Sequence, residues 1–326
     1  MKLGILGAGG IAGTMADTVN KMNRAGIGDV QLYAVAARDL ERAKAFARKN
    51  GVEKAFGSYE EMLSDPELDL VYVATPHSHH MEHAKLCVMH GKAALVEKAF
   101  TANAAQAREL IALAEEKKVL VTEAIWPRYQ PMRKIINEVV FSGIVGEPRT
   151  ITANLSYLIN HVPRIVEPAL AGGALLDVGV YALNFAEMVF GRCDRAAGIA
   201  QMIPTGVDST DAIMLFWKNG RRAVLTAGTD CMSDRKGIIY CTEGFIIVEN
   251  INNPQSLAVY DKNYACIKEI KAPAQQTGYE YEVLEAVKTL KEGGIECPSM
   301  PHEESLHVME LMDDLRAQMG VKYPFE

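Results

Sequence analysis

The stretch LGILGAGGIAGT at residues 3–14 determines the fold class that we expect for this chain. Its apolar start, Leu3–Leu6, is typical of a short buried strand, and a helical pattern follows over Ile11–Arg24. A glycine-rich turn that leads from a strand directly into a helix is how a parallel βαβ unit begins. The stretch therefore predicts an α/β fold whose first strand lies in a parallel sheet.

The alternation of strands and helices continues to about residue 125. Further strands are expected at Gln31–Ala37, Leu68–Ala74, Ala93–Glu97 and Val119–Ala124, with helices at Asp39–Asn50, His79–His90 and Asn103–Lys117. The capping pattern Ser58-x-x-Glu61 and the residues Asp39 and Asn103 mark expected helix starts.

After about residue 145, apolar runs follow one another with turn residues between them, as in an antiparallel sheet. Hairpins are expected at Asn219-Gly220 and Glu243-Gly244, and closing helices at Tyr279–Glu292 and His302–Met319. We therefore predict two domains: a Rossmann domain over residues 1–123, and over residues 124–326 an α+β domain with a large, mostly antiparallel open sheet.

The composition narrows the class of protein. With 326 residues, 49% hydrophobic and 23% charged, the chain has the balance of a globular protein large enough for two cores. A net charge of −7 gives no reason to expect a nucleic-acid partner. We see no unbroken apolar run of roughly 18 residues for a membrane span, no signal peptide after Met1-Lys2, and no C-x-x-C pair. We therefore expect a cytoplasmic protein with reduced thiols and no membrane partner.

The glycine turn carries the first functional prediction. Gly7 permits the tight turn, Gly9 lets the backbone approach a pyrophosphate, and Ala12 lets the helix pack closely on the strand. The N–H groups at Gly10 and Ile11 lie at the positive end of the helix dipole, where phosphates bind. In this context the motif predicts an NAD(P) site, although a plain tight βα turn would need similar glycines.

The residues Ala36-Ala37-Arg38-Asp39, at the end of the second strand, bear on the choice of dinucleotide. Small residues followed by Arg38 would make room for the 2′-phosphate of NADP and pair with it. Asp29 has the spacing of an NAD ribose ligand but precedes the strand, whereas the ligand lies at the carboxyl end. We expect NADP; NAD remains the alternative if Arg38 is merely solvated.

Two more loops leave carboxyl ends of predicted strands. His77, His79, His80 and His83 crowd the first, and the i,i+4 pair His79 and His83 would suit a metal. Because no cysteine and few carboxylates accompany them, we expect no metal and favour roles in lining the cofactor site or on the helix surface. The second loop carries Lys98, which is either a solvated residue or a positive charge placed near a developing alkoxide.

These residues resemble the Gfo/Idh/MocA family of oxidoreductases. The matching elements are G-x-G-x-x-A at residues 7–12, Ala74–His80, Glu97-Lys98 and Gly172–Tyr181. Within the family the chain is most similar to the branch of dimeric dihydrodiol dehydrogenases and NADP-dependent D-xylose dehydrogenases. That likeness lies in Glu123–Arg128, Asp177–Tyr181 and Pro301–Leu306.

The resemblance implies a hydride transfer between nicotinamide and a hydroxyl or carbonyl of a sugar, sugar derivative or cyclic diol. It implies Tyr181 as acid/base, assisted by Lys98 and Asp177, and a homodimer formed through the C-terminal sheet. The cofactor would be lined by Gly7, Gly9, Gly10, Ile11, Ala12, Arg38, Thr75, Pro76, His77, His80, Glu97, Lys98, Trp126 and Arg128. Arg164 and Asn184 are further pocket candidates.

Two departures from the family pattern matter. Proline usually follows Glu-Lys, sometimes as a cis peptide, whereas this chain has Ala99, for which we expect a trans bond. Many members carry histidine at the position of Tyr181, so a phenol would replace an imidazole here.

Several alternatives stay open. Asp177 and Tyr181, four apart, would share a helix face, but they would also suit a capping aspartate and a half-buried tyrosine. Trp126 would equally suit core packing. The chain would alternatively be an NAD-linked inositol or sugar dehydrogenase with a different acid/base, or a non-catalytic NAD(P)-binding redox sensor or regulator.

Overall fold

The computed structural model describes residues 1–326, which form two compact units. The first unit comprises Met1–Trp126 and Gln275–Leu306, and the second comprises Pro127–Ala274 and His307–Glu326. The chain thus leaves the first unit at Trp126, close to the predicted boundary at residue 123. It also returns to it over residues 275–306, which we had expected in the second domain, because helix α9 (Glu280–Lys291) packs against α1 and β5.

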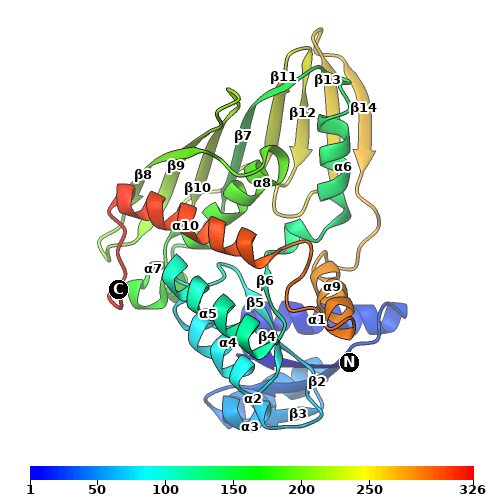
Figure 1. The fold of residues 1–326 in the computed structure, drawn as a ribbon, viewed down its shortest axis with the longest axis vertical. Helices are drawn as coiled ribbons and strands as arrows, with labels where there is room; N and C mark the ends of the chain where they lie inside the picture. Colours follow the sequence, from blue (N-terminus) through cyan, green and yellow to red (C-terminus); the bar gives the residue numbers. More distant parts are fainter. The chain divides into compact units, whose positions relative to one another are not determined.

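Six parallel strands form the sheet of the first unit, in the order β3-β2-β1-β4-β5-β6 (Figure 1). They are β1 (Lys2–Leu6), β2 (Gln31–Ala36), β3 (Lys54–Phe56), β4 (Leu70–Val73), β5 (Ala93–Glu97) and β6 (Val121–Ala124). The order reverses between β1 and β4, the switch point at which Rossmann domains bind dinucleotides. The predicted parallel sheet is confirmed; β3 was missed because three half-buried residues show no periodicity.

Helices connect these strands, and Figure 1 shows α4 and α5 side by side. They are α1 (Gly10–Ala25), α2 (Leu40–Asn50), α3 (Tyr59–Leu63), α4 (His80–Met89) and α5 (Ala104–Lys117). The predicted N-caps are confirmed: Asp39, Ser58 and Asn103 each accept a backbone N–H of the helix that follows.

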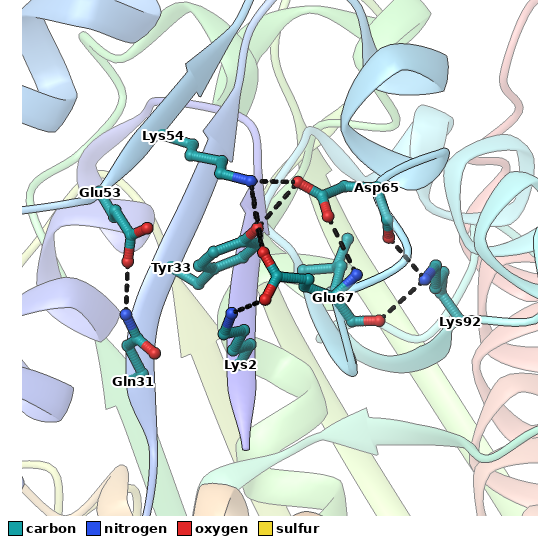
Figure 2. Close-up of polar contacts among 9 residues, drawn as sticks. Lys2, Gln31, Tyr33, Glu53, Lys54, Asp65, Glu67 and Lys92 are labelled. Carbon is teal, nitrogen blue, oxygen red and sulfur yellow. Dashed lines mark hydrogen bonds and ion pairs between the residues drawn. The ribbon is translucent and has the colours of Figure 1, made fainter.

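A polar cluster lies at the amino ends of the strands, the opposite edge from the glycine turn (Figure 2). Asp65 Oδ2 accepts hydrogen bonds from Tyr33 Oη at 2.9 Å and from Lys54 Nζ at 2.8 Å. Lys2 Nζ donates to Glu67 Oε1 at 2.5 Å. Because ligands of open α/β sheets bind at the carboxyl edge, we interpret this cluster as structural.

Eight strands form the sheet of the second unit, in the order β14-β13-β12-β11-β7-β10-β9-β8. They are β7 (Pro148–Ser156), β8 (Arg195–Met202), β9 (Asp208–Phe216), β10 (Arg222–Gly228), β11 (Gly237–Cys241), β12 (Gly244–Glu249), β13 (Ser256–Asp261) and β14 (Cys266–Lys271). All neighbours are antiparallel except β7 and β10. Both predicted hairpins are confirmed, as β9–β10 and β11–β12.

Helices cover one face of this sheet. They are α6 (Pro131–Val140), α7 (Pro163–Val166), a π-helical turn at Leu175–Gly179 that continues into α8 (Val180–Phe190), and most of α10 (His302–Met319). Helix α8 packs against β7 and β10, and the inward side chains Ile213, Leu225 and Ile239 are buried. On the other face Ile199 is 74% exposed and Met214 41% exposed.

The stretch Pro168–Phe190 is long and apolar enough to cross a membrane, judged by length and composition alone. Its most apolar window has a mean hydropathy of 1.4, and 89% of that window is buried inside the protein. Burial of this kind is what the core helix of a folded domain shows.

Candidate active site

The glycine turn has the shape that a dinucleotide phosphate requires. Gly7 has φ +105°, and a Cβ there would lie 2.9 Å from the carbonyl oxygen of Ala74. A Cβ added to Gly9 or to Gly10 would meet nothing within 4 Å. Helix α1 starts at Gly10 with no capping side chain and no acidic residue in its first turn. The open backbone and uncapped N–H groups therefore fit a pyrophosphate.

Two arginines lie near this turn, at the carboxyl end of β2. Arg38 is exposed, and Arg42 donates from Nη2 to the carbonyl oxygen of Ala8 at 3.1 Å. Burial raises the pKa of Tyr59, while both guanidinium groups act to lower it, so its ring lies within their field. Asp39 accepts the N–H of Glu41 and is committed to capping α2. Arg42 was not among the predicted site residues, although it lies one helical turn beyond Arg38.

The histidines after β4 are held by the protein itself. His80 is buried, with Nδ1 2.8 Å from the carbonyl oxygen of Ala99 and Nε2 2.8 Å from that of Thr75. Burial lowers the pKa of His80 to about 4, so the ring is neutral and donates through one nitrogen. Burial also lowers the pKa of His83 to about 4, and its Nδ1 lies 3.0 Å from Thr75 Oγ1.

His80 thus lies between two loops and donates to one of their carbonyl oxygens, and its predicted place at the cofactor stays a prediction. His77 is also buried and meets the His80 ring edge-on, with 5.6 Å between centroids. Pro76 accepts the N–H of His79 at the start of this turn. No group of three or more His, Cys, Asp or Glu side chains is arranged to hold a metal ion.

The loop that carries Lys98 is fixed by buried side chains. Glu97 accepts a hydrogen bond from the hydroxyl of Tyr72, and its Oε2 accepts the N–H of Lys98 at 3.2 Å. The Lys98–Ala99 peptide is cis, so our prediction of a trans bond was wrong. The prediction rested only on the free-energy cost of a cis bond before a residue other than proline, and not on the contacts around the bond. In the structure the next peptide group, Ala99–Phe100, is held on both sides. Its carbonyl oxygen lies 2.8 Å from His80 Nδ1, and its N–H donates to Glu123 Oε1 at 3.1 Å.

The segment that returns to the first unit packs against this region. Tyr279 stacks on Trp126 with 4.0 Å between ring centroids and 4° between ring planes. One face of Trp126 is therefore covered by protein, which favours the packing alternative for that face. Glu282 is fully buried, and burial followed by the charge of Glu97 raises its pKa well above the usual range.

The second unit carries the other predicted catalytic residues. Asp177 lies in the π-helical turn and Tyr181 in the first turn of α8, so the two do not follow the plain α-helical spacing that we had assumed. Both are buried, and Asp177 Oδ1 accepts from Arg164 Nη1 at 2.6 Å. The segment therefore presents a carboxylate and a phenol, and α7 adds the guanidinium of Arg164. Such groups are suited to binding hydroxyl groups and moving a proton.

Arg128 and Asn184 form a second buried pair in the same unit. Arg128 Nε donates to Asn184 Oδ1 at 2.5 Å, and Asn184 donates to the carbonyl oxygen of Val180 in turn. The pocket candidates Arg164 and Asn184 thus each contact a predicted site residue.

Comparison with known proteins covers almost the whole chain. A family profile described as an oxidoreductase family with an NAD-binding Rossmann fold matches residues 1–125, and the GFO/IDH/MocA C-terminal domain matches residues 132–247. The chain is 32% identical over 334 residues to trans-1,2-dihydrobenzene-1,2-diol dehydrogenase of Mus musculus, covering 99% of this chain and 98% of that protein. It is 36% identical over 330 residues to the Xenopus tropicalis protein of the same name, covering 99% of each.

Solved structures share the fold. A 3-ketoreductase from Actinomadura kijaniata in complex with TDP-benzene and NADP superposes with a TM-score of 0.86 at 22% identity, over 98% of each chain. An aldose–aldose oxidoreductase from Caulobacter crescentus complexed with glycerol has a TM-score of 0.85 at 19% identity, over 98% of this chain and 97% of that one. The chain has an NAD(P)-binding Rossmann domain, and dehydrogenases align with it over nearly their full length. This chain is therefore an NAD(P)-dependent dehydrogenase or reductase that belongs to the Gfo/Idh/MocA family.

Proposed function

We propose that this protein is an NADP-dependent dehydrogenase that oxidises a hydroxyl group of a cyclic trans-diol or a sugar, with Tyr181 as the acid/base. The observation that carries the proposal is the 32–36% identity to trans-1,2-dihydrobenzene-1,2-diol dehydrogenases over 99% of the chain. The phenol of Tyr181, the ammonium of Lys98 and the Asp177–Arg164 pair are the groups that this chemistry needs.

Oxidation converts one C–OH group to C=O. The hydroxyl proton passes to the ionised Tyr181 Oη, and the C–H bond breaks with its electron pair, leaving the carbonyl. NADP⁺, when bound at the glycine turn, would supply the acceptor for that hydride. The positive charge of Lys98 stabilises both the phenolate and the developing alkoxide. In reduction, Tyr181 returns the proton to the carbonyl oxygen.

The two arginines near the glycine turn support NADP over NAD. A 2′-phosphate would pair with Arg38 and Arg42, whereas Asp39, the carboxylate that would bind free ribose hydroxyls, is occupied in capping α2. Fluorescence titration with NADPH and separately with NADH tests this. We expect tighter NADPH binding, and we expect Arg38→Ala to weaken it about 10- to 100-fold while leaving NADH affinity unchanged. Tighter binding of NADH would contradict the assignment.

The role of Tyr181 is tested by Tyr181→Phe, which keeps the ring and removes the proton carrier. We expect kcat for trans-1,2-dihydrobenzene-1,2-diol to fall about 10²- to 10⁴-fold with NADPH affinity retained. Tyr264→Phe is the matched control, because Tyr264 is 80% exposed. Full turnover by Tyr181→Phe would remove Tyr181 from the mechanism.

A substrate screen separates this proposal from its alternatives. D-xylose and myo-inositol, each with NADP⁺ and NAD⁺, test the sugar and inositol dehydrogenase activities. NADPH binding without turnover of any diol or sugar would instead favour a redox sensor.

We also propose that the protein is a homodimer formed through the uncovered face of the second sheet. The exposed apolar side chains Ile199, Met214 and Val224 lie on that face, and an apolar sheet face of this kind is typical of a subunit interface. Light scattering tests the proposal: a mass near 35.7 kDa, that of one chain, would contradict it.

A further inference from the structure

Two carboxyl groups of β9 are buried next to the segment that carries Asp177 and Tyr181. Asp208 is 1% exposed and Asp211 is 0% exposed, and neither forms an ion pair. The π-helical turn of that segment packs directly on β9 and β10. Buried carboxyl groups without a cation destabilise a fold unless hydrogen bonds compensate them, so their partners show what they do.

Asp208 caps the start of this segment from a neighbouring strand. Its Oδ2 accepts the N–H of Leu175 at 2.6 Å, across 33 residues of sequence. Burial raises the pKa of Asp208, while the N–H groups of Leu175 and Ala174 act to lower it. Leu175 begins the π-helical turn, which has no capping side chain of its own. A carboxylate here satisfies a backbone donor that the helix leaves without an acceptor, and it faces the positive end of the helix dipole.

Two adjacent glycines have no room for a side chain, and Gly173 is the one that lets the carboxylate come this close. Gly173 has φ +115°, and a Cβ there would lie 2.1 Å from Asp208 Oδ1. A Cβ on Gly172 would lie 2.5 Å from the carbonyl oxygen of Ile165. In this chain Gly173 of the family motif is therefore required by a tertiary contact with β9, and Gly172 by a contact with the backbone of α7.

Asp211 supplies the proton that lets two carboxyl groups share the site. Burial, and then the adjacent Asp208 carboxylate, raise the pKa of Asp211, so it is protonated at neutral pH. The Asp211 side chain in turn acts to lower the pKa of Asp208, which favours the charge of the capping carboxylate.

The C-terminal tail also contacts the start of this segment. The hydroxyl of Tyr323 donates to the carbonyl oxygen of Gly172 at 2.9 Å, and burial and then Asp208 raise its pKa. Arg316 lies over the Tyr323 ring, 4.7 Å from its centroid, and is ion-paired with Glu326 and Asp313. The start of the segment is thus held by β9 through Asp208 and by the tail through Tyr323.

We propose that Asp208, supported by Asp211, is a positioning residue that holds the segment carrying Asp177 and Tyr181 in its catalytic place. The proposal rests on the proposed role of Tyr181. Leu175 is hydrogen-bonded to β9, and Asp177 follows two residues later, so release of this anchor frees the backbone immediately before the site. A shift of about 1 Å in a reacting group costs roughly 100-fold in rate.

Asp208→Ala tests the anchor, and Asp211→Asn is its matched variant, because an amide still donates to Asp208. Hydrogen–deuterium exchange of residues 174–181 reports the anchor itself. Turnover of trans-1,2-dihydrobenzene-1,2-diol with NADP⁺ reports catalysis, and NADPH titration reports the cofactor site. We expect Asp208→Ala to speed exchange about tenfold and lower kcat about 10- to 100-fold, with NADPH affinity unchanged. Asp211→Asn should keep the exchange rate of residues 174–181 and kcat near their wild-type values at pH 7.

Unchanged exchange over 174–181 in the folded Asp208→Ala protein would overturn the anchor, whatever its activity. Faster exchange with unchanged kcat would overturn its catalytic consequence. Tyr181→Phe, measured in parallel, distinguishes failure of the proposed function: full turnover there rejects Tyr181, while the exchange result still decides the anchor. If Asp208→Ala does not fold, Asp208→Asn, which keeps the shape and loses the charge, should show a smaller change in the same direction, and no change would overturn the proposal.

Discussion

Replacing Asp211 with asparagine should change how the stability of the second unit depends on pH. An exposed aspartate carboxyl has a pKa of 3.8, and burial followed by the charge of Asp208 raises the pKa of Asp211 to about 9. Between these values the folded protein holds a proton that the unfolded chain releases. Folding then takes up a proton, so the free energy of unfolding falls as the pH rises through this window.

The magnitude follows from the linkage relation. One proton taken up on folding changes the free energy of unfolding by about 1.4 kcal/mol per pH unit. From pH 5 to pH 8 the wild-type protein should therefore lose about 4 kcal/mol through Asp211 alone. Asparagine is uncharged throughout this range. The free energy of unfolding of Asp211→Asn should therefore rise by about 4 kcal/mol relative to that of the wild type between pH 5 and pH 8.

Urea unfolding at several pH values measures this difference. The chain has two tryptophans, and Trp217 is buried in the second unit, so a Trp126→Phe background makes its fluorescence specific to that unit. Asp230→Asn is the control, because Asp230 is exposed just after β10. A difference between Asp211→Asn and wild type that stays flat from pH 5 to pH 8 would refute the reasoning.

Three further predictions concern stability. Gly173→Ala should cost about 2–4 kcal/mol, because its Cβ would clash with Asp208. Gly206→Ala, with φ +95° but open space around its Cβ, should cost only about 1 kcal/mol, and thermal unfolding of the two variants compares them. The ammonium of Lys54 lowers the pKa of Asp65 to about 2, so the stability that Asp65 adds is present above about pH 4 and is lost as the pH falls towards 2. Asp65→Asn should abolish that acid-side loss without altering NADPH affinity in a titration. Tyr323→Phe removes the donor to a buried carbonyl and should lower the free energy of unfolding by about 1–3 kcal/mol in urea.

Much of the fold was readable in the chain because its signals are local. The glycine turn at residues 7–12, the helix caps and the two hairpin turns each depend on residues within a few positions of one another. Such signals act through backbone conformation and short-range hydrogen bonds, which a sequence displays directly. The same locality placed Arg38 at the end of β2 and Lys98 after β5.

What the sequence alone left undecided depends on residues far apart. His302 Nε2 lies 2.8 Å from the carbonyl oxygen of Val121, across 181 positions, in the returning segment that we had placed in the other domain. The contact of Arg42 with the glycine turn and the capping of Leu175 by Asp208 are of the same kind. Packing of distant elements selects these contacts, and no local propensity encodes them. The sequence by itself therefore determined the class of fold and the domain that binds the dinucleotide, whereas only the tertiary structure decided what holds the candidate catalytic residues in position.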